Sequence, residues 1–171
     1  MKLLRLLASI AVLCTLAGCS SAPGPSAGQE SAGNWKSAPP DMKKKMTVFL
    51  DQMAAVYRRL GQDVKKEGYC LVFTDLGPES LERDQPLLFA TLLAKGSAGG
   101  VRFRGFSNAI VDSTSVHDKK TGEKGVGFMM IDMKDDGGGA FGVSGAWYEK
   151  EGAWHEVNYH LAQEAGKWRA Q

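Results

Sequence analysis

The chain has 171 residues, of which 43% are hydrophobic and 23% are charged. Lys and Arg number 21 and Asp and Glu number 19, so the charges nearly balance. Nucleic-acid-binding domains carry a basic excess, and this composition argues against that class of partner. The length suits one domain with its own hydrophobic core.

The first 18 residues have the three parts of a secretory signal peptide. Lys2 and Arg5 supply a positive start, and an apolar stretch without acidic residues follows as far as Leu16. A run of roughly 11 apolar residues is too short to cross a bilayer as a helix, which takes about 20. We therefore expect residues 1–18 to direct export and then to be removed. The mature chain would carry 19 basic and 19 acidic residues, which again disfavours nucleic acid.

Leu16-Ala17-Gly18-Cys19 ends this segment. The four residues resemble the lipobox of bacterial lipoproteins, Leu-small-Gly-Cys, at the expected distance from the N-terminus. The resemblance implies cleavage before Cys19, a diacylglyceryl thioether on its sulfur and an acyl chain on its new amine. Two or three chains, at about 0.8 kcal/mol per buried CH₂, attach a protein stably to a membrane. The alternative is an ordinary signal with a cysteine near its cleavage site.

Residues 19–40 follow the expected cleavage site and are rich in Ser, Ala, Gly and Pro. Such a segment buries too little apolar surface to fold, so we expect a flexible linker that reaches on the order of 25 Å from the membrane. By the sorting rules of the lipoprotein family, Ser20 favours the outer membrane over the inner one. We expect the folded domain, residues 41–171, to face the periplasm.

The domain is expected to begin with an amphipathic helix, with Asp41 as its N-cap and Gly61 at its end. Apolar residues recur there at the spacing of one helical face: Met42, Met46, Phe49, Leu50, Met53, Val56, Tyr57 and Leu60. We interpret the stripe as core; the alternative is a Met-rich surface that binds a partner. We interpret Lys43-Lys44-Lys45 as solvated, with contact to anionic lipid as the alternative.

In the middle of the chain, the apolar residues change from helical spacing to the alternation typical of a β-strand, which has a period of two residues. Residues 69–74 are predicted to form a strand, and within it Cys70 is expected to be buried as a small hydrophobe. The alternative for this last cysteine is an exposed thiol that forms a dimer. Gly77-Pro78-Glu79 is expected to open a turn or a short helix. The apolar run 86–95 fits either a helix or a strand, and strands are predicted at 101–106 and 109–117.

Four strand candidates fill the C-terminal third, at 126–134, 140–149, 153–163 and 167–170, and glycine-containing turns separate them. Short connections require antiparallel neighbours. The predicted fold is therefore α+β, with one amphipathic N-terminal helix packed on a curved antiparallel β-meander.

The last hairpin has the pattern Gly152-x-Trp154-x-x-Val157-x-Tyr159-x-Leu161, followed by Gly166-Lys167-Trp168. This pattern resembles the end of cystatin-like and NTF2-like domains. The resemblance implies a cone-shaped pocket between helix and sheet, lined partly by Trp and Tyr. The candidate ligand-binding residues are Trp147, Trp154, Tyr159 and Trp168.

A search for catalytic or metal-binding motifs yields no catalytic residue, metal site or cofactor. His155 and His160 lie five residues apart on one predicted strand, so they point to opposite faces. Glu156, Asn158 and His160 share a face with Trp154, which we interpret as a solvated strand face. The calcium-loop pattern that would start at Asp132 fails at its later positions, so we interpret this segment as a turn.

The nearest match to a nucleophile motif is Gly142-Val143-Ser144-Gly145, whose second glycine comes one place early, in a predicted hairpin strand rather than an elbow. We therefore favour a lipid-anchored, non-catalytic envelope module that binds a protein partner or assists assembly. One alternative is a module that holds a small apolar ligand in a helix–sheet pocket. The other is a periplasmic hydrolase that uses Ser144 or a histidine.

Overall fold

The computed structural model describes residues 38–75 and 81–171. The predictions for the signal peptide, for Cys19, for nearly all of the linker and for the turn at Gly77 lie outside these residues. The elements follow in chain order: α2 (Pro40–Lys66), β1 (Leu71–Asp75), α3 (Leu81–Asp84), α4 (Pro86–Gly96), β2 (Arg102–Gly105), the 3₁₀ helix η2 (Phe106–Asn108), β3 (Ala109–Val111), β4 (Val116–Asp118), β5 (Lys124–Gly137), β6 (Ala140–Tyr148), β7 (Trp154–Glu164) and β8 (Lys167–Ala170).

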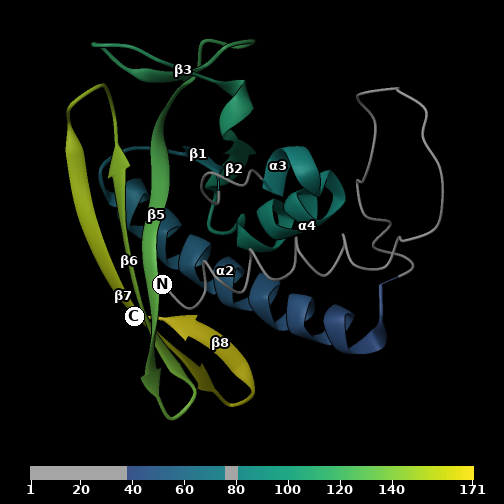
Figure 1. Ribbon diagram of the computed structural model, residues 1–171. Helices are drawn as coiled ribbons and strands as arrows, with labels where there is room; N and C mark the ends of the chain where they lie inside the picture. The colour runs from purple at the N-terminus through teal and green to yellow at the C-terminus, as the bar shows by residue number, and fades with distance from the viewer. Residues whose placement is uncertain (1–37, 76–80) are drawn as a thin grey trace, which may run out of the picture.

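The strands form one curled sheet in the order β2-β1-β5-β6-β7-β8, and the β3–β4 hairpin is attached to the start of β5. Figure 1 shows α2 crossing one face of this sheet, with α3 and α4 to one side and the β3–β4 hairpin at one end. We call the face that α2 covers the inner face and the opposite one the outer face. The α+β class predicted from the sequence is confirmed.

Two finer features of the predicted fold are wrong. The sheet is mixed rather than antiparallel, because β1 pairs in parallel with both β2 and β5. The α2 helix is also not alone, because the apolar run 86–95 forms α4 and a short α3 precedes it. A parallel pair requires a crossover connection, and α3 and α4 lie in the one between β1 and β2. The hairpins from β5 to β8 are antiparallel, as predicted.

The predicted apolar stripe of α2 is the centre of the core. Tyr57 is fully buried, stacks on Phe103 with ring centroids 4.9 Å apart, and its hydroxyl lies 2.9 Å from that of Thr74. The helix differs from its prediction at both ends: it begins at Pro40, where Asp41 pairs with Lys45 instead of capping. It also continues through Gly61 to Lys66, since packing outweighs the roughly 1 kcal/mol helix cost of a glycine.

A second, smaller core lies on the outer face, where the β3–β4 hairpin covers the sheet. Its buried members are Leu71, Phe73, Val116 and Tyr148. The strand predicted over 109–117 is wrong, because the chain reverses within it. The carboxylate of Asp112 accepts bonds from the backbone N–H groups of Thr114 and Ser115, at 2.7 and 2.9 Å, and so stabilises the reversal between β3 and β4.

Cys70 is exposed, so its predicted burial is wrong. It precedes β1 rather than lying within it, and its carbonyl oxygen accepts a bond from the N–H of Arg102 at 2.9 Å. The residues that follow it, Leu71 to Phe73, are the ones that enter the two cores. A one-residue difference in where a strand begins decides the environment of this side chain.

Candidate functional site

The outer face of the sheet is only partly covered, because the β3–β4 hairpin reaches one end of it. Beyond the hairpin, large apolar side chains are open to solvent: Met129 is 44% exposed, Ile131 is 61% exposed and Trp154 is 51% exposed. Ile131 occupies a bulge in the pairing of β5 with β6, between Met130 and Asp132. A cluster of this kind, adjacent to polar residues, is typical of an interaction surface.

Neighbouring rings fix the position of Trp154. Its ring lies 4.4 Å from that of Tyr148, the residue opposite it in the β6–β7 ladder. Tyr148 is buried in the smaller core beside Phe106, and burial raises the pKa of its hydroxyl. The exposed indole therefore rests on a buried aromatic support rather than moving freely.

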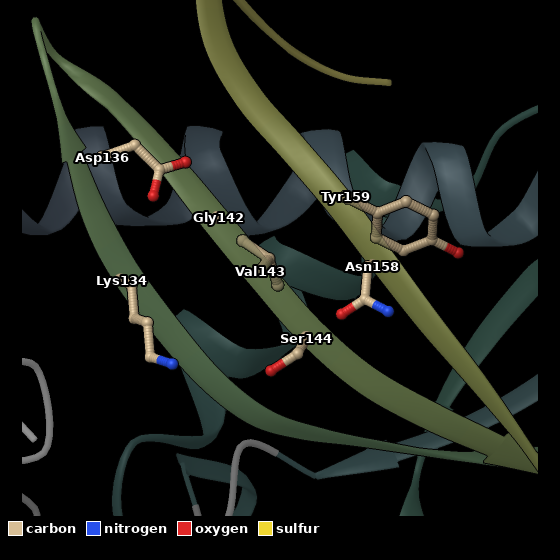
Figure 2. Close-up of a pocket in the computed structure, with 7 residues that line it drawn as sticks. All are labelled: Lys134, Asp136, Gly142, Val143, Ser144, Asn158 and Tyr159. Atoms are coloured by element: carbon tan, nitrogen blue, oxygen red, sulfur yellow. The ribbon is translucent and has the colours of Figure 1, made fainter.

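A small polar hollow adjoins the exposed apolar residues. It lies on β5, β6 and β7, at the end of the sheet away from the β3–β4 hairpin. Figure 2 shows the residues that line it: Lys134, Asp136, Gly142, Val143, Ser144, Asn158 and Tyr159. Its volume is about 170 Å³, below the range of about 300–1,000 Å³ for pockets that enclose a small molecule. It suits a single polar group of a larger partner.

Charged groups of both signs surround this hollow. The Lys134 ammonium lies 3.5 Å from Asp132, and the His160 imidazole lies 3.6 Å from Asp136. Ser144 is opposite Asn158 in the ladder, whereas His160 is opposite Gly142. Among the described residues no hydrogen bond joins Ser144 to a histidine, which is the pairing that activates the serine in a Ser–His site.

Metal binding can be judged for residues 38–75 and 81–171. No group of three His, Cys, Asp or Glu side chains in these ranges is placed to hold an ion. In the same part of the chain, no helix has the length and apolar character needed to span a bilayer.

The structure separates the four predicted ligand-binding aromatics. Trp147 and Tyr159 are buried in the main core, and Trp168 packs against that core with its ring 6.0 Å from Phe141. Trp154 lies on the outer face, beside Glu156, Asn158 and His160 as the strand alternation predicted. Besides the polar hollow, another hollow of about 410 Å³ lies at the surface of α2 near residues 98–99. Ligand binding between helix and sheet stays a prediction.

Tyr159 is committed to the contact between β7 and α2. Its hydroxyl donates to the Asp63 carboxylate at 3.1 Å, and the Arg59 guanidinium lies 5.7 Å from the centre of its ring. Burial, followed by the negative charge of Asp63, raises the pKa of Tyr159 far above its usual range. Tyr159 is among the residues that line the polar hollow, but its hydroxyl is bonded to Asp63 inside the protein.

A second polar cluster, which the sequence did not indicate, joins the start of β1 to the end of β6. The Tyr69 hydroxyl donates to Glu149, and this bond raises the pKa of Tyr69 to about 12 and lowers that of Glu149. The His155 imidazole lies 3.4 Å from Glu149 and stacks on Trp147 at 3.9 Å. Tyr69 and His155 both pair with Glu149, so this carboxylate links the segments that carry them.

Comparison with known proteins adds no relative: the chain matches no protein-family model, no curated protein and no solved structure. The candidate surface is therefore argued from its own residues.

Sequence reasoning missed Met129 and Ile131, although the sequence carries a signal for them. In β5 the residues from Phe128 to Ile131 are all apolar, so both faces of the strand carry apolar side chains, which a half-solvated strand does not require.

Proposed function

We propose that this protein is a lipid-anchored component of the bacterial envelope whose folded domain is a non-catalytic module that binds a protein partner. The lipobox ending at Cys19 supports the anchor, and the composition of residues 19–40 supports a tether. Ser20 favours the outer membrane, with the domain in the periplasm. The resemblance of the last hairpin to cystatin-like and NTF2-like domains stays a prediction.

The observation that carries the binding role is the arrangement of the outer face. Met129, Ile131 and Trp154 form an exposed apolar area, and the polar hollow around Ser144 and Asn158 adjoins it. Protein interfaces combine an apolar, often aromatic centre with a polar rim in this way. The support that Tyr148 gives to Trp154 reduces the entropy that the indole would lose on binding.

The anchor is tested by replacing Cys19. A Cys19→Ser chain should take up no labelled fatty acid and should leave the membrane fraction, whereas the parent chain should take up the label and stay in the membrane fraction. A Cys70→Ser chain is the matched control, because Cys70 is the cysteine of the folded domain and is exposed. A Cys19→Ser chain that stayed as firmly membrane-bound as the parent would contradict the anchor.

The binding surface is tested by crosslinking in living cells with a photoreactive residue at position 131. A second chain with the same residue at position 87 is the control, since Leu87 is 75% exposed on α4, away from the outer face. We expect one defined adduct from position 131, absent from position 87 and lost when Met129 and Trp154 are replaced by Ser. Identical patterns from both positions, or none, would exclude the outer face.

The alternative of a small apolar ligand has its own measurement. Native mass spectrometry of the protein purified from its own cells would show a bound mass that organic extraction removes. We keep the protein-partner proposal because the exposed apolar residues lie on the outer face, whereas Trp147 and Tyr159 contact α2 in the core.

A further inference from the structure

The first half of β7 is a free edge of the sheet. β6 pairs with β7 without interruption from Trp154 to Leu161, but β8 pairs with β7 only from Leu161 onward. Figure 1 shows the first half of β7 as the outermost strand on its side of the sheet. Among the described residues, no strand covers β7 between Trp154 and Tyr159.

The direction of the backbone groups along this edge follows from one hydrogen-bonded pair of residues. The N–H of His160 donates to the carbonyl of Gln171 at 3.1 Å, and the N–H of Gln171 returns a bond to His160 at 3.0 Å. Backbone groups alternate between the two sides of a strand, so those of Trp154, Glu156 and Asn158 point to the same side as those of His160. There they meet no backbone partner in the described residues.

Other sheet edges carry features that discourage further pairing, as natural edges do. β2 and β8 are each four residues long, and each carries two basic side chains. The part of β5 beyond β1 has two register shifts and four charged residues, Asp132, Lys134, Asp135 and Asp136. The free half of β7 has no proline, no lysine, no arginine and no bulge, and Glu156 is its one acidic residue.

Glu156 lies at the middle of this edge and makes no ion pair with a described residue. Two copies could pair antiparallel only about a two-fold axis normal to the sheet, with one residue opposite itself. Because Gln171 already lies beside His160, the register that pairs all three free residues centres on Glu156. It places two carboxylates directly opposite each other, which is destabilising. The register that offers the most backbone bonds is thus unfavourable for a second copy of this chain.

We propose that the free edge of β7 binds an extended segment of a protein partner by strand addition, with Lys or Arg opposite Glu156. The backbone groups of Trp154, Glu156 and Asn158 would supply the ladder, and the Glu156 charge would select the residue at its centre. Trp154 and Asn158 would flank that residue on the outer face. This inference depends on the proposed function for the class of partner, and it names the element and the chemistry that bind.

Synthetic nine-residue strand-forming peptides with Lys or Glu at the centre provide the probe. The full chain, purified in detergent micelles, should bind the Lys peptide about two- to fivefold more tightly than the Glu peptide, the range for an opposite-charge cross-strand pair. A Glu156→Lys chain should reverse this preference. Binding should slow hydrogen exchange at the amides of Trp154, Glu156 and Asn158.

Asn158→Pro provides a second variant. It removes an N–H that points to the free edge, and it leaves the bonds from β7 to β6 in place, so we expect loss of peptide binding in a folded chain. The inference is overturned by equal affinity for both peptides, by protection at another strand, or by concentration-dependent dimers that Asn158→Pro abolishes. If the peptides fail while position 131 still gives its adduct in cells, the edge inference is wrong and the proposed function stands.

Discussion

Neighbouring residues of β5 have opposite surroundings: Phe128 is 2% exposed and packs beneath α2, whereas Met129 is 44% exposed on the outer face. β7 shows the same contrast, with Tyr159 buried against α2 and Asn158 in solvent. The inner face is closed by a 27-residue helix, and the outer face is closed only where the β3–β4 hairpin lies. Apolar residues of the inner face stabilise the fold, whereas those of the outer face remain available for binding.

The largest expected effect separates the two faces by stability. Leu60→Ala removes a fully buried side chain from the inner core and should lower the free energy of unfolding by about 2–5 kcal/mol. Ile131→Ala, on the open side, should change it by no more than about 0.5 kcal/mol. Urea denaturation measures both. Equal losses would mean that Ile131 is part of the core, and the contrast between the faces would be wrong.

The next effect concerns the support of the apolar surface. A Cβ at Gly127 would lie 2.2 Å from the ring of Tyr148, so Gly127→Ala should displace that ring and lower the free energy of unfolding by about 1–3 kcal/mol. Because Tyr148 supports Trp154, crosslinking from position 131 should weaken as well. Gly61→Ala is the control. Gly61 lies within α2, and a Cβ there would make ordinary contacts, at 3.5 Å or more, with Val101 and Phe103. A stable Gly127→Ala chain with unchanged crosslinks would contradict the role of Tyr148.

The third effect concerns the hairpin that covers one end of the outer face. Asp118 accepts bonds from the backbone N–H groups of Thr121 and Lys120, both at 2.9 Å, and contacts Arg104. These contacts, led by the Thr121 N–H, lower the pKa of Asp118 to about 2. Its contribution to stability is therefore present above about pH 4 and is lost as the pH falls towards 2.

Thermal unfolding between pH 5 and pH 2 measures this contribution. The midpoint of the parent chain should fall over the window, and that of Asp118→Asn should fall less, because its side chain does not titrate. A residual slope should remain from Asp112, whose pKa the Thr114 hydroxyl, its principal partner, lowers to about 2. Parallel curves for parent and variant would contradict a role for the ionised form of Asp118.

The smallest expected effect is at the junction of β1 and β6. Because Tyr69 donates to Glu149, its pKa is raised to about 12, so the stability from this bond is complete below pH 10 and is lost as the pH rises through 12. Tyr69→Phe should lower the free energy of unfolding by about 1 kcal/mol at pH 8 and flatten its alkaline decline. Tyr148→Phe is the comparison: burial rather than a hydrogen bond raises the pKa of Tyr148, so this variant should flatten the alkaline decline without losing a hydrogen bond at pH 8. If Tyr69→Phe left the alkaline decline of the free energy of unfolding unchanged, the role given to the Tyr69–Glu149 bond would be wrong.

Part of the candidate site was predictable from strand alternation. The sequence placed Trp154, Glu156, Asn158 and His160 on one face of a strand, and the structure confirms this. It also indicated the turns that join β5 to β8. Alternation alone puts Trp154 and Tyr159, five residues apart on one strand, on opposite faces. It did not show which of the two faces a helix covers.

The sequence alone determined the local elements: the core face of α2, from Met46 to Leu60, and the antiparallel order of β5 to β8 follow from periodicity and short turns. Only the tertiary structure decided that β1 enters the sheet between β2 and β5, that Cys70 is exposed, and that β7 keeps a free edge. The physical reason is range. Hydrogen bonding and side-chain spacing within a few residues fix an element, whereas the pairing of distant strands depends on which surfaces remain unburied once the helices have packed.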